Sequence, residues 1–145
     1  MVSDSPGVPK PNLTETLFTL FLRLVAVACL WFGLQYWAML TGISMGGRGR
    51  FDLLPAAWKA AATALAVLLP VAAVGLWLRV SWGPVIWVIA AGTEIAMYEV
   101  YPSIFGVNNL VVLMHCAVAA LFVLFRIAIF VQRRRQARKV RSDSP

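Results

Sequence analysis

Four apolar stretches, each close to the length that a bilayer requires, constrain this chain more than any other feature. They cover residues 17–40, 55–78, 84–101 and 107–131. A helix needs about 20 residues to cross the ~30 Å hydrocarbon layer, and it satisfies its own backbone hydrogen bonds there. The sequence therefore predicts an all-α, polytopic membrane protein with four transmembrane helices in an up-down bundle.

Composition leaves no room for a separate soluble domain, because 61% of the residues are hydrophobic and only 13% are charged. We expect a single transmembrane domain over residues 15–132. The segment 1–14 is rich in Ser, Pro and Gly and is predicted to be a disordered tail. Residues 133–145 are predicted to form a basic cytoplasmic tail.

Prolines and one acid mark the ends of the predicted helices. Asp52 is expected to cap the helix that begins near Pro55, and Pro70 is expected to kink that helix. Pro84 fits the first turn of the third helix, where its missing N–H has no partner to lose. Pro102 ends the third helix.

Basic residues predict how the helices are oriented. They crowd the end of the chain, as Arg133, Arg134, Arg135, Arg138, Lys139 and Arg141. With four spans, Lys10 and Arg79 share that side, whereas Arg48, Arg50 and Lys59 lie on the other. Segments rich in Lys and Arg stay inside the cell. We therefore expect both termini in the cytoplasm.

The basic tail is interpreted first as a topology signal that contacts anionic lipid headgroups. The sharper alternative is a docking peptide for a cytoplasmic partner. Nucleic-acid binding is disfavoured, because no aromatic residues alternate with the charges and no binding fold is attached. Arg23 and Arg126 lie inside apolar stretches near the predicted cytoplasmic boundary. They are expected to snorkel to the inner headgroups or, alternatively, to hold an anion or a partner carboxylate.

Glu94 lies deep in the third apolar stretch, too far from water for a short carboxylate to snorkel. Ionisable side chains in hydrocarbon are costly, so Glu94 is a candidate functional residue by default. Helical spacing puts five residues on its face: Trp87, Ala90, Ala91, Tyr98 and Tyr101. Tyr98 is the hydroxyl nearest to the carboxylate.

His115 lies at a similar distance along the returning helix, which makes it the candidate partner of Glu94. Asn108, Ala119, Phe122 and Arg126 share its helical face. One interpretation is that a Glu–His pair joins two helices, as buried polar groups do in membrane bundles. The other is a protonatable site that couples proton movement to a small solute or senses pH. Matching depth does not establish that the two side chains face each other.

Three further charged residues are expected at the outer interface. Glu99 points away from the face of Glu94 and is expected to meet water or one of the outer basic residues. Asp52 and Arg50 lie in the predicted outer loop and helix start.

The residue types disfavour enzyme chemistry and resident cofactors. Cys29 and Cys116 have no Cys-x-x-Cys spacing, and a single histidine cannot supply a bis-histidine haem site. No cluster supplies enough zinc ligands, and no catalytic triad or glycine-rich nucleotide loop is present. We expect no metal, no cofactor and no enzyme. Small residues four apart, such as Cys29 and Gly33, favour close packing with a partner helix or a second copy.

Three segments carry a resemblance to a known family. They are Arg50-Phe-Asp-Leu-Leu-Pro-Ala-Ala-Trp-Lys59, Gly75-Leu-Trp-Leu-Arg-Val-Ser-Trp-Gly-Pro-Val-Ile-Trp87 and Thr93-Glu-Ile-Ala-Met-Tyr98. The chain resembles an uncharacterised family of small four-helix integral membrane proteins of alphaproteobacteria, the rhizobia and their relatives. The resemblance covers roughly the membrane region. It implies a location in the bacterial inner membrane and adds no catalytic residues.

These observations favour a non-enzymatic accessory or scaffold component of an envelope complex, with lipid and a membrane-protein partner or a homo-oligomer as its contacts. The alternative is a proton-linked small-solute transporter that uses the Glu94 and His115 pair.

Overall fold

The computed structural model describes residues 12–43 and 51–142, and every element in these ranges is helical. The α-helices are α1 (Leu13–Thr41), α2 (Ala56–Trp77), α3 (Trp82–Ile95), α4 (Pro102–Phe105) and α5 (Asn109–Ser142). A 3-10 turn, η1 (Phe51–Leu53), precedes α2, and a π-helical turn, η2 (Ala96–Val100), follows α3. The predicted all-α class is confirmed.

Three of the helices are long and apolar enough to cross a membrane: α1 over 29 residues, α2 over 22, and α5 over the 30 residues Asn109–Arg138. The stretch expected as the third span is not α-helical throughout. It consists of the 14-residue α3, followed directly by the five residues of the π-helical turn η2. The described chain thus has the helices of a membrane protein, with three candidate spans that are each a single α-helix.

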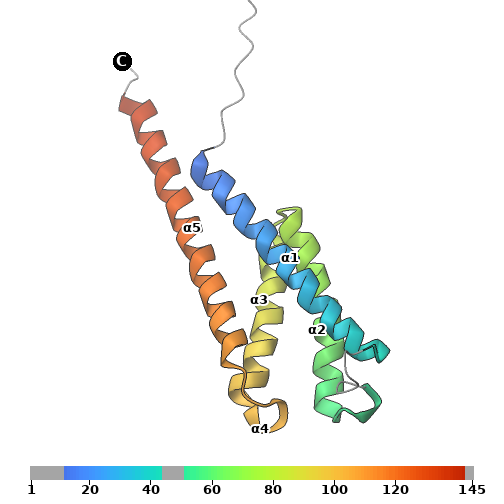
Figure 1. The fold of residues 1–145 in the computed structure, drawn as a ribbon. Helices are drawn as coiled ribbons and strands as arrows, with labels where there is room; N and C mark the ends of the chain where they lie inside the picture. Colours follow the sequence, from blue (N-terminus) through green and yellow to red (C-terminus); the bar gives the residue numbers. More distant parts are fainter. Residues whose placement is uncertain (1–11, 44–50, 143–145) are drawn as a thin grey trace, which may run out of the picture.

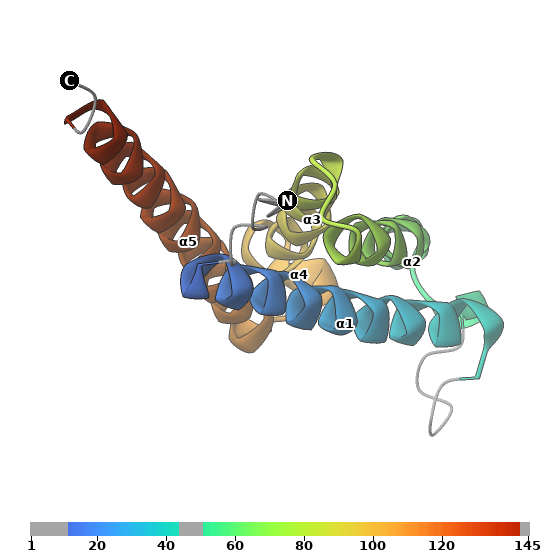
Figure 2. The same ribbon diagram turned by 90° about the horizontal axis from the view of Figure 1, so that it is seen from above.

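The packed part of the molecule consists of α1, α2 and α3, and α1 crosses the other two (Figure 1). Helix α5 leans against this group and then extends beyond it, and Figure 2 shows it leading away from the other helices. In the most apolar window of α5 only 6% of the residues are buried, against 44% for α2. The start of α1 and the last turns of α5 lie toward the same end of the molecule, opposite α4 (Figure 1).

Close backbone approaches hold α1, α2 and α3 together. Pro70 lies inside α2, which stays helical on both sides of it, and its ring packs on Gly33 of α1. A Cβ added to Gly33 would lie 2.8 Å from Pro70 Cδ. Gly83 of α3 lies directly against Gly75 of α2, so the absence of both side chains sets how closely these helices meet.

Several expected boundaries are wrong. The last helix does not end at 131, because α5 continues to Ser142, and the described part of the predicted basic tail, residues 133–142, is therefore helical. Arg, Gln, Lys and Ala are good helix formers, and Gln132 bonds Thr14 of α1 at 2.7 Å. At the other end, α1 begins at Leu13, so the last two residues of the predicted N-terminal tail are helical. Residues 1–11 and 143–145 lie outside the described residues.

Asp52 does not cap α2, so that expectation is also wrong. Asp52 lies in η1, and Pro55 occupies the position before the first residue of α2 with an extended backbone (ψ 154°). Proline suits this site because it sets φ near the helical value and has no N–H to leave unsatisfied.

The glycine contact between α2 and α3 predicts a specific packing defect. A Cβ on Gly83 would lie 2.7 Å from the carbonyl oxygen of Gly75, and this backbone cannot rotate away. Gly83→Ala should lower the free energy of unfolding by about 1–3 kcal/mol, the usual cost of overpacking. Gly92→Ala is the matched control, because a Cβ on Gly92 meets nothing within 4 Å. Unfolding in detergent, followed by circular dichroism, measures both variants; equal stability would contradict the packing.

Candidate functional site

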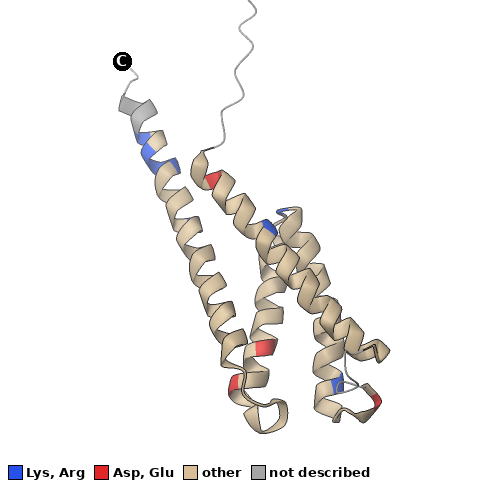
Figure 3. Ribbon diagram, in the orientation of Figure 1, with Lys and Arg blue, Asp and Glu red and all other residues tan. Residues whose placement is uncertain are grey.

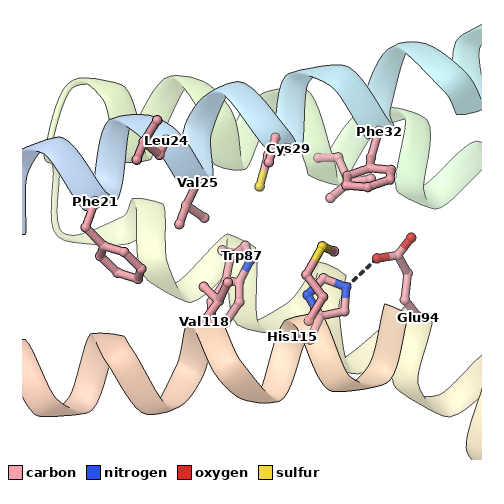
Figure 4. Close-up of a pocket in the computed structure, with 12 residues that line it drawn as sticks. Phe21, Leu24, Val25, Cys29, Phe32, Trp87, Glu94, His115 and Val118 are labelled. Carbon is pink, nitrogen blue, oxygen red and sulfur yellow. Dashed lines mark hydrogen bonds and ion pairs between the residues drawn. The ribbon is translucent and has the colours of Figure 1, made fainter. Parts of the chain in front are cut away.

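Glu94 is the centre of a buried polar cluster that joins three helices. Its side chain lies near the end of α3 and is 5% exposed. Tyr36 of α1 donates its hydroxyl to Oε1 at 2.8 Å, and Nε2 of His115 on α5 lies 2.6 Å from Oε2. Figure 4 shows Glu94 and His115 pointing toward each other. Each carboxylate oxygen therefore has its own partner, from a different helix.

The sequence of α3 explains why the carboxylate can lie this deep. Trp87, Ala90 and Ala91 are buried on the same face as Glu94, as helical spacing predicts. The two alanines let neighbouring helices approach, so the carboxylate reaches a hydroxyl on α1 instead of facing lipid. His115, also 5% exposed, packs beside the ring of Trp87 with centroids 6.0 Å apart.

The π-helical turn η2 changes the face of α3 just after Glu94. Wider turns of this kind shift the angular position of every later residue, and they occur frequently at functional sites. Met97 is buried and Tyr98 is half-buried, but Tyr101 is 54% exposed. The prediction that Tyr101 shares the face of Glu94 is therefore wrong, because it assumed regular α-helical spacing through residues 96–100.

Glu94 lies between two cavities. The first, here called the α1–α5 cavity, has a volume of about 260 Å³ and is lined by Cys29, Phe32, Trp87 and His115 among others (Figure 4). The second, the tyrosine cavity, has a volume of about 250 Å³ and is lined mainly by polar and aromatic side chains: Gln35, Tyr36, Trp58, Tyr98 and Asn108. Glu94 and Phe32 line both cavities.

The cluster links the linings of these two cavities. Tyr36 lines the tyrosine cavity, His115 lines the α1–α5 cavity, and Glu94 bonds both. A carboxylate accepts from an imidazolium or from the neutral imidazole N–H, whereas a carboxylic acid donates to an unprotonated ring nitrogen. The 2.6 Å contact is therefore kept in more than one protonation state, which is what a proton relay requires.

Glu99 and Asp52, which were expected at the outer interface, lie apart from the cluster. Glu99 is exposed on η2. Asp52 lies in η1, where its backbone carbonyl accepts a 3.3 Å hydrogen bond from Lys59 Nζ. Arg50 lies outside the described residues. In Figure 3, the acidic positions in α3 and η2 lie apart from the acidic position in η1, near the start of α2.

Apart from Lys59 near the start of α2, the described basic residues lie toward the end of the molecule opposite α4 (Figure 3). Arg23 lies over the ring of Trp77, 5.4 Å from its centroid, and Arg126 lines a cavity with Arg79. Arg133 reaches Glu15 at 3.4 Å, and Arg134 lies over Phe130. Arg135 and Arg138 are exposed on α5, and the side chains of Lys139 and Arg141 lie outside the described residues.

Sequence reasoning missed Tyr36. The signal that could have found it is the Tyr36 hydroxyl itself, which lies within the apolar stretch 17–40, on a different helix from Glu94 and at a similar depth. No group of three or more His, Cys, Asp or Glu side chains forms a metal site within the described ranges. Cys29 is buried beside the α1–α5 cavity, and Cys116 is exposed on α5.

Removing the Tyr36 hydroxyl tests whether the cluster is formed. Tyr36→Phe leaves Oε1 of Glu94 without its donor and should lower the free energy of unfolding by about 0.5–1.5 kcal/mol. Tyr101→Phe removes the same hydroxyl from an exposed ring and should change stability by less than about 0.5 kcal/mol. Unfolding by SDS titration measures both. If the two variants lose equal stability, the hydrogen bond to Glu94 is absent.

A family model described as a family of unknown function (DUF6163) matches residues 16–133. The chain belongs to this family, and the matched region contains Tyr36, Glu94 and His115 together. Comparison with curated proteins gave no match, and neither did comparison with solved structures.

Proposed function

We propose that this member of the family is a four-span protein of an alphaproteobacterial inner membrane, with both termini in the cytoplasm. Helix α3 and turn η2 run without a break from Trp82 to Val100, and at about 1.5 Å per residue they cover most of a ~30 Å hydrocarbon layer. Arg79 and the basic end of α5 then lie on the cytoplasmic side, in contact with anionic lipid headgroups.

Within that membrane, the protein acts as a non-enzymatic accessory or scaffold component of an envelope complex. The observation that carries this proposal is the low burial of α5. In the most apolar window of this helix, only 6% of the residues are buried. The face of α5 opposite its contacts with α1 and α3 is exposed along its whole apolar length. It consists of Leu113, Ala117, Ala120, Leu124, Ile127 and Val131. Small residues at its centre permit close approach by a partner helix.

Native mass spectrometry of the tagged protein, extracted gently from its own membranes, tests the accessory role. We expect a defined second polypeptide at fixed stoichiometry. Ala120→Phe should remove it, because the added ring fills the centre of the exposed face. Val123→Phe is the control, since Val123 is also exposed on α5 but lies on a different face. A second chain that survives Ala120→Phe, or no second chain, would contradict this interface.

A second candidate function, proton-linked transport of a small solute, is favoured by one specific observation. The Glu94 carboxylate lines two cavities and is bonded to a group that faces each of them. Coupling proton movement to solute movement requires a group that is protonated from one side and deprotonated from the other.

Uptake into membrane vesicles tests the transport proposal. Vesicles with and without a pH gradient are given a metabolite mixture, and their contents are measured by mass spectrometry. A transported solute should accumulate only with the gradient, in the natural protein and in Glu99→Gln but not in Glu94→Gln. Glu99 is the control because its carboxylate is exposed and separate from the cluster. Accumulation that persists in Glu94→Gln would overturn the proposal.

A further inference from the structure

A second polar cavity lies at the end of the bundle opposite α4, where the α2–α3 turn meets α1 and α5. Its volume is about 320 Å³, and its polar lining comes from Arg79, Ser81 and Arg126. We propose that this cavity, here called the arginine pocket, binds the phosphate group of an anionic phospholipid from the cytoplasmic leaflet. The proposal rests on the membrane orientation proposed above and is independent of the accessory and transport roles.

Two arginines give the arginine pocket a positive charge. Arg79 comes from the α2–α3 turn and Arg126 from α5, so two separate elements bring an arginine to the lining of one cavity. The residues that line the cavity include no acid, and neither arginine forms an ion pair among the described residues. Two unpaired guanidinium groups favour an anion between them, and their planar donors match phosphate oxygens.

The backbone of Arg79 adopts a conformation that is unfavourable for arginine. Arg79 has φ 57°, a left-handed conformation in which helices commonly end on glycine. The turn is closed by hydrogen bonds from Arg79 N to Leu76 O and from Val80 N to Gly75 O. An arginine here costs about 1 kcal/mol or more relative to glycine. A glycine at position 79 would form the same turn without strain, but it would place no charge at the cavity. The strained arginine provides both the turn and the charge.

The start of α3 adds to the positive potential of the arginine pocket. Ser81 precedes the 14-residue α3, and both Ser81 and Pro84 line the cavity. The first turn of a helix carries the positive end of the helix dipole, which attracts anions; here Pro84 has no N–H, and the N–H of Gly83 already donates to Val80 O. Two guanidinium groups and one helix start therefore converge on the same space.

The remaining walls favour a lipid over free phosphate. Apolar side chains form them: Phe18, Leu22, Leu76, Val80 and Phe122. Arg126 also borders an apolar groove along α5, of about 520 Å³, that includes Ile127 and Phe130. A phospholipid can place its phosphate on the arginines and its glycerol and first acyl carbons on these walls, whereas inorganic phosphate leaves them uncovered.

Lipid binding to the purified full-length protein tests the proposal. The probe is phosphatidylglycerol, titrated into the detergent-solubilised protein and counted by native mass spectrometry. Arg79→Gly and Arg126→Gln should each weaken the first binding event about tenfold, as expected for the loss of a charge-assisted hydrogen bond. Arg79→Gly also relieves the left-handed backbone, so its thermal unfolding temperature should not fall. Unchanged phosphatidylglycerol binding in both variants would overturn the proposal.

Two controls separate this site from its alternatives. Arg138→Gln removes an exposed charge from the end of α5 and should change the first binding event less than twofold. An equal loss in Arg138→Gln would mean that the whole basic surface attracts lipid and that no arginine pocket is involved. Inorganic phosphate is the second probe. If millimolar phosphate displaces phosphatidylglycerol, the site takes a soluble anion and the lipid proposal fails.

Discussion

The structure depends on how the Glu94 carboxyl group is accommodated within an apolar bundle. A carboxyl group without hydrogen-bond partners is costly in a low-dielectric interior. Here one oxygen accepts from Tyr36 on α1 and the other meets His115 on α5. Because the partners lie on two other helices, satisfying a single side chain fixes the relative positions of α1, α3 and α5. The same bonds separate the α1–α5 cavity from the tyrosine cavity.

Two kinds of packing surround this cluster. Helices α1, α2 and α3 meet through glycine and proline contacts that tolerate no added side chain, at Gly33 with Pro70 and at Gly75 with Gly83. Helix α5 is attached differently: aromatic rings and polar bonds join it to α1 near Phe18, and His115 joins it to α3. The Glu94–His115 contact is therefore the buried polar link between α5 and the packed group of helices.

Apolar length and helical spacing predicted much of this arrangement. They gave the all-α class, the buried face of α3 and the residues Glu94 and His115, although depth alone did not establish their contact. The position of Tyr101 could not be predicted, because η2 departs from the α-helical repeat and nothing local in its sequence marks a wider turn. Tyr36 and the arginine pocket were missed for a different reason. Each depends on side chains from separate helices, and periodicity within one helix says nothing about its neighbours.

A double-mutant cycle between Glu94 and His115 tests whether this pair joins α3 to α5. The free energy of unfolding is measured for the natural protein, Glu94→Gln, His115→Gln and the double variant, by SDS titration in the same detergent. We expect a coupling energy of about 0.6–1.7 kcal/mol, the range typical of strong interhelical polar pairs in membranes. Additive losses in folded variants, with a coupling energy near zero, would contradict the claim that this pair joins α3 to α5.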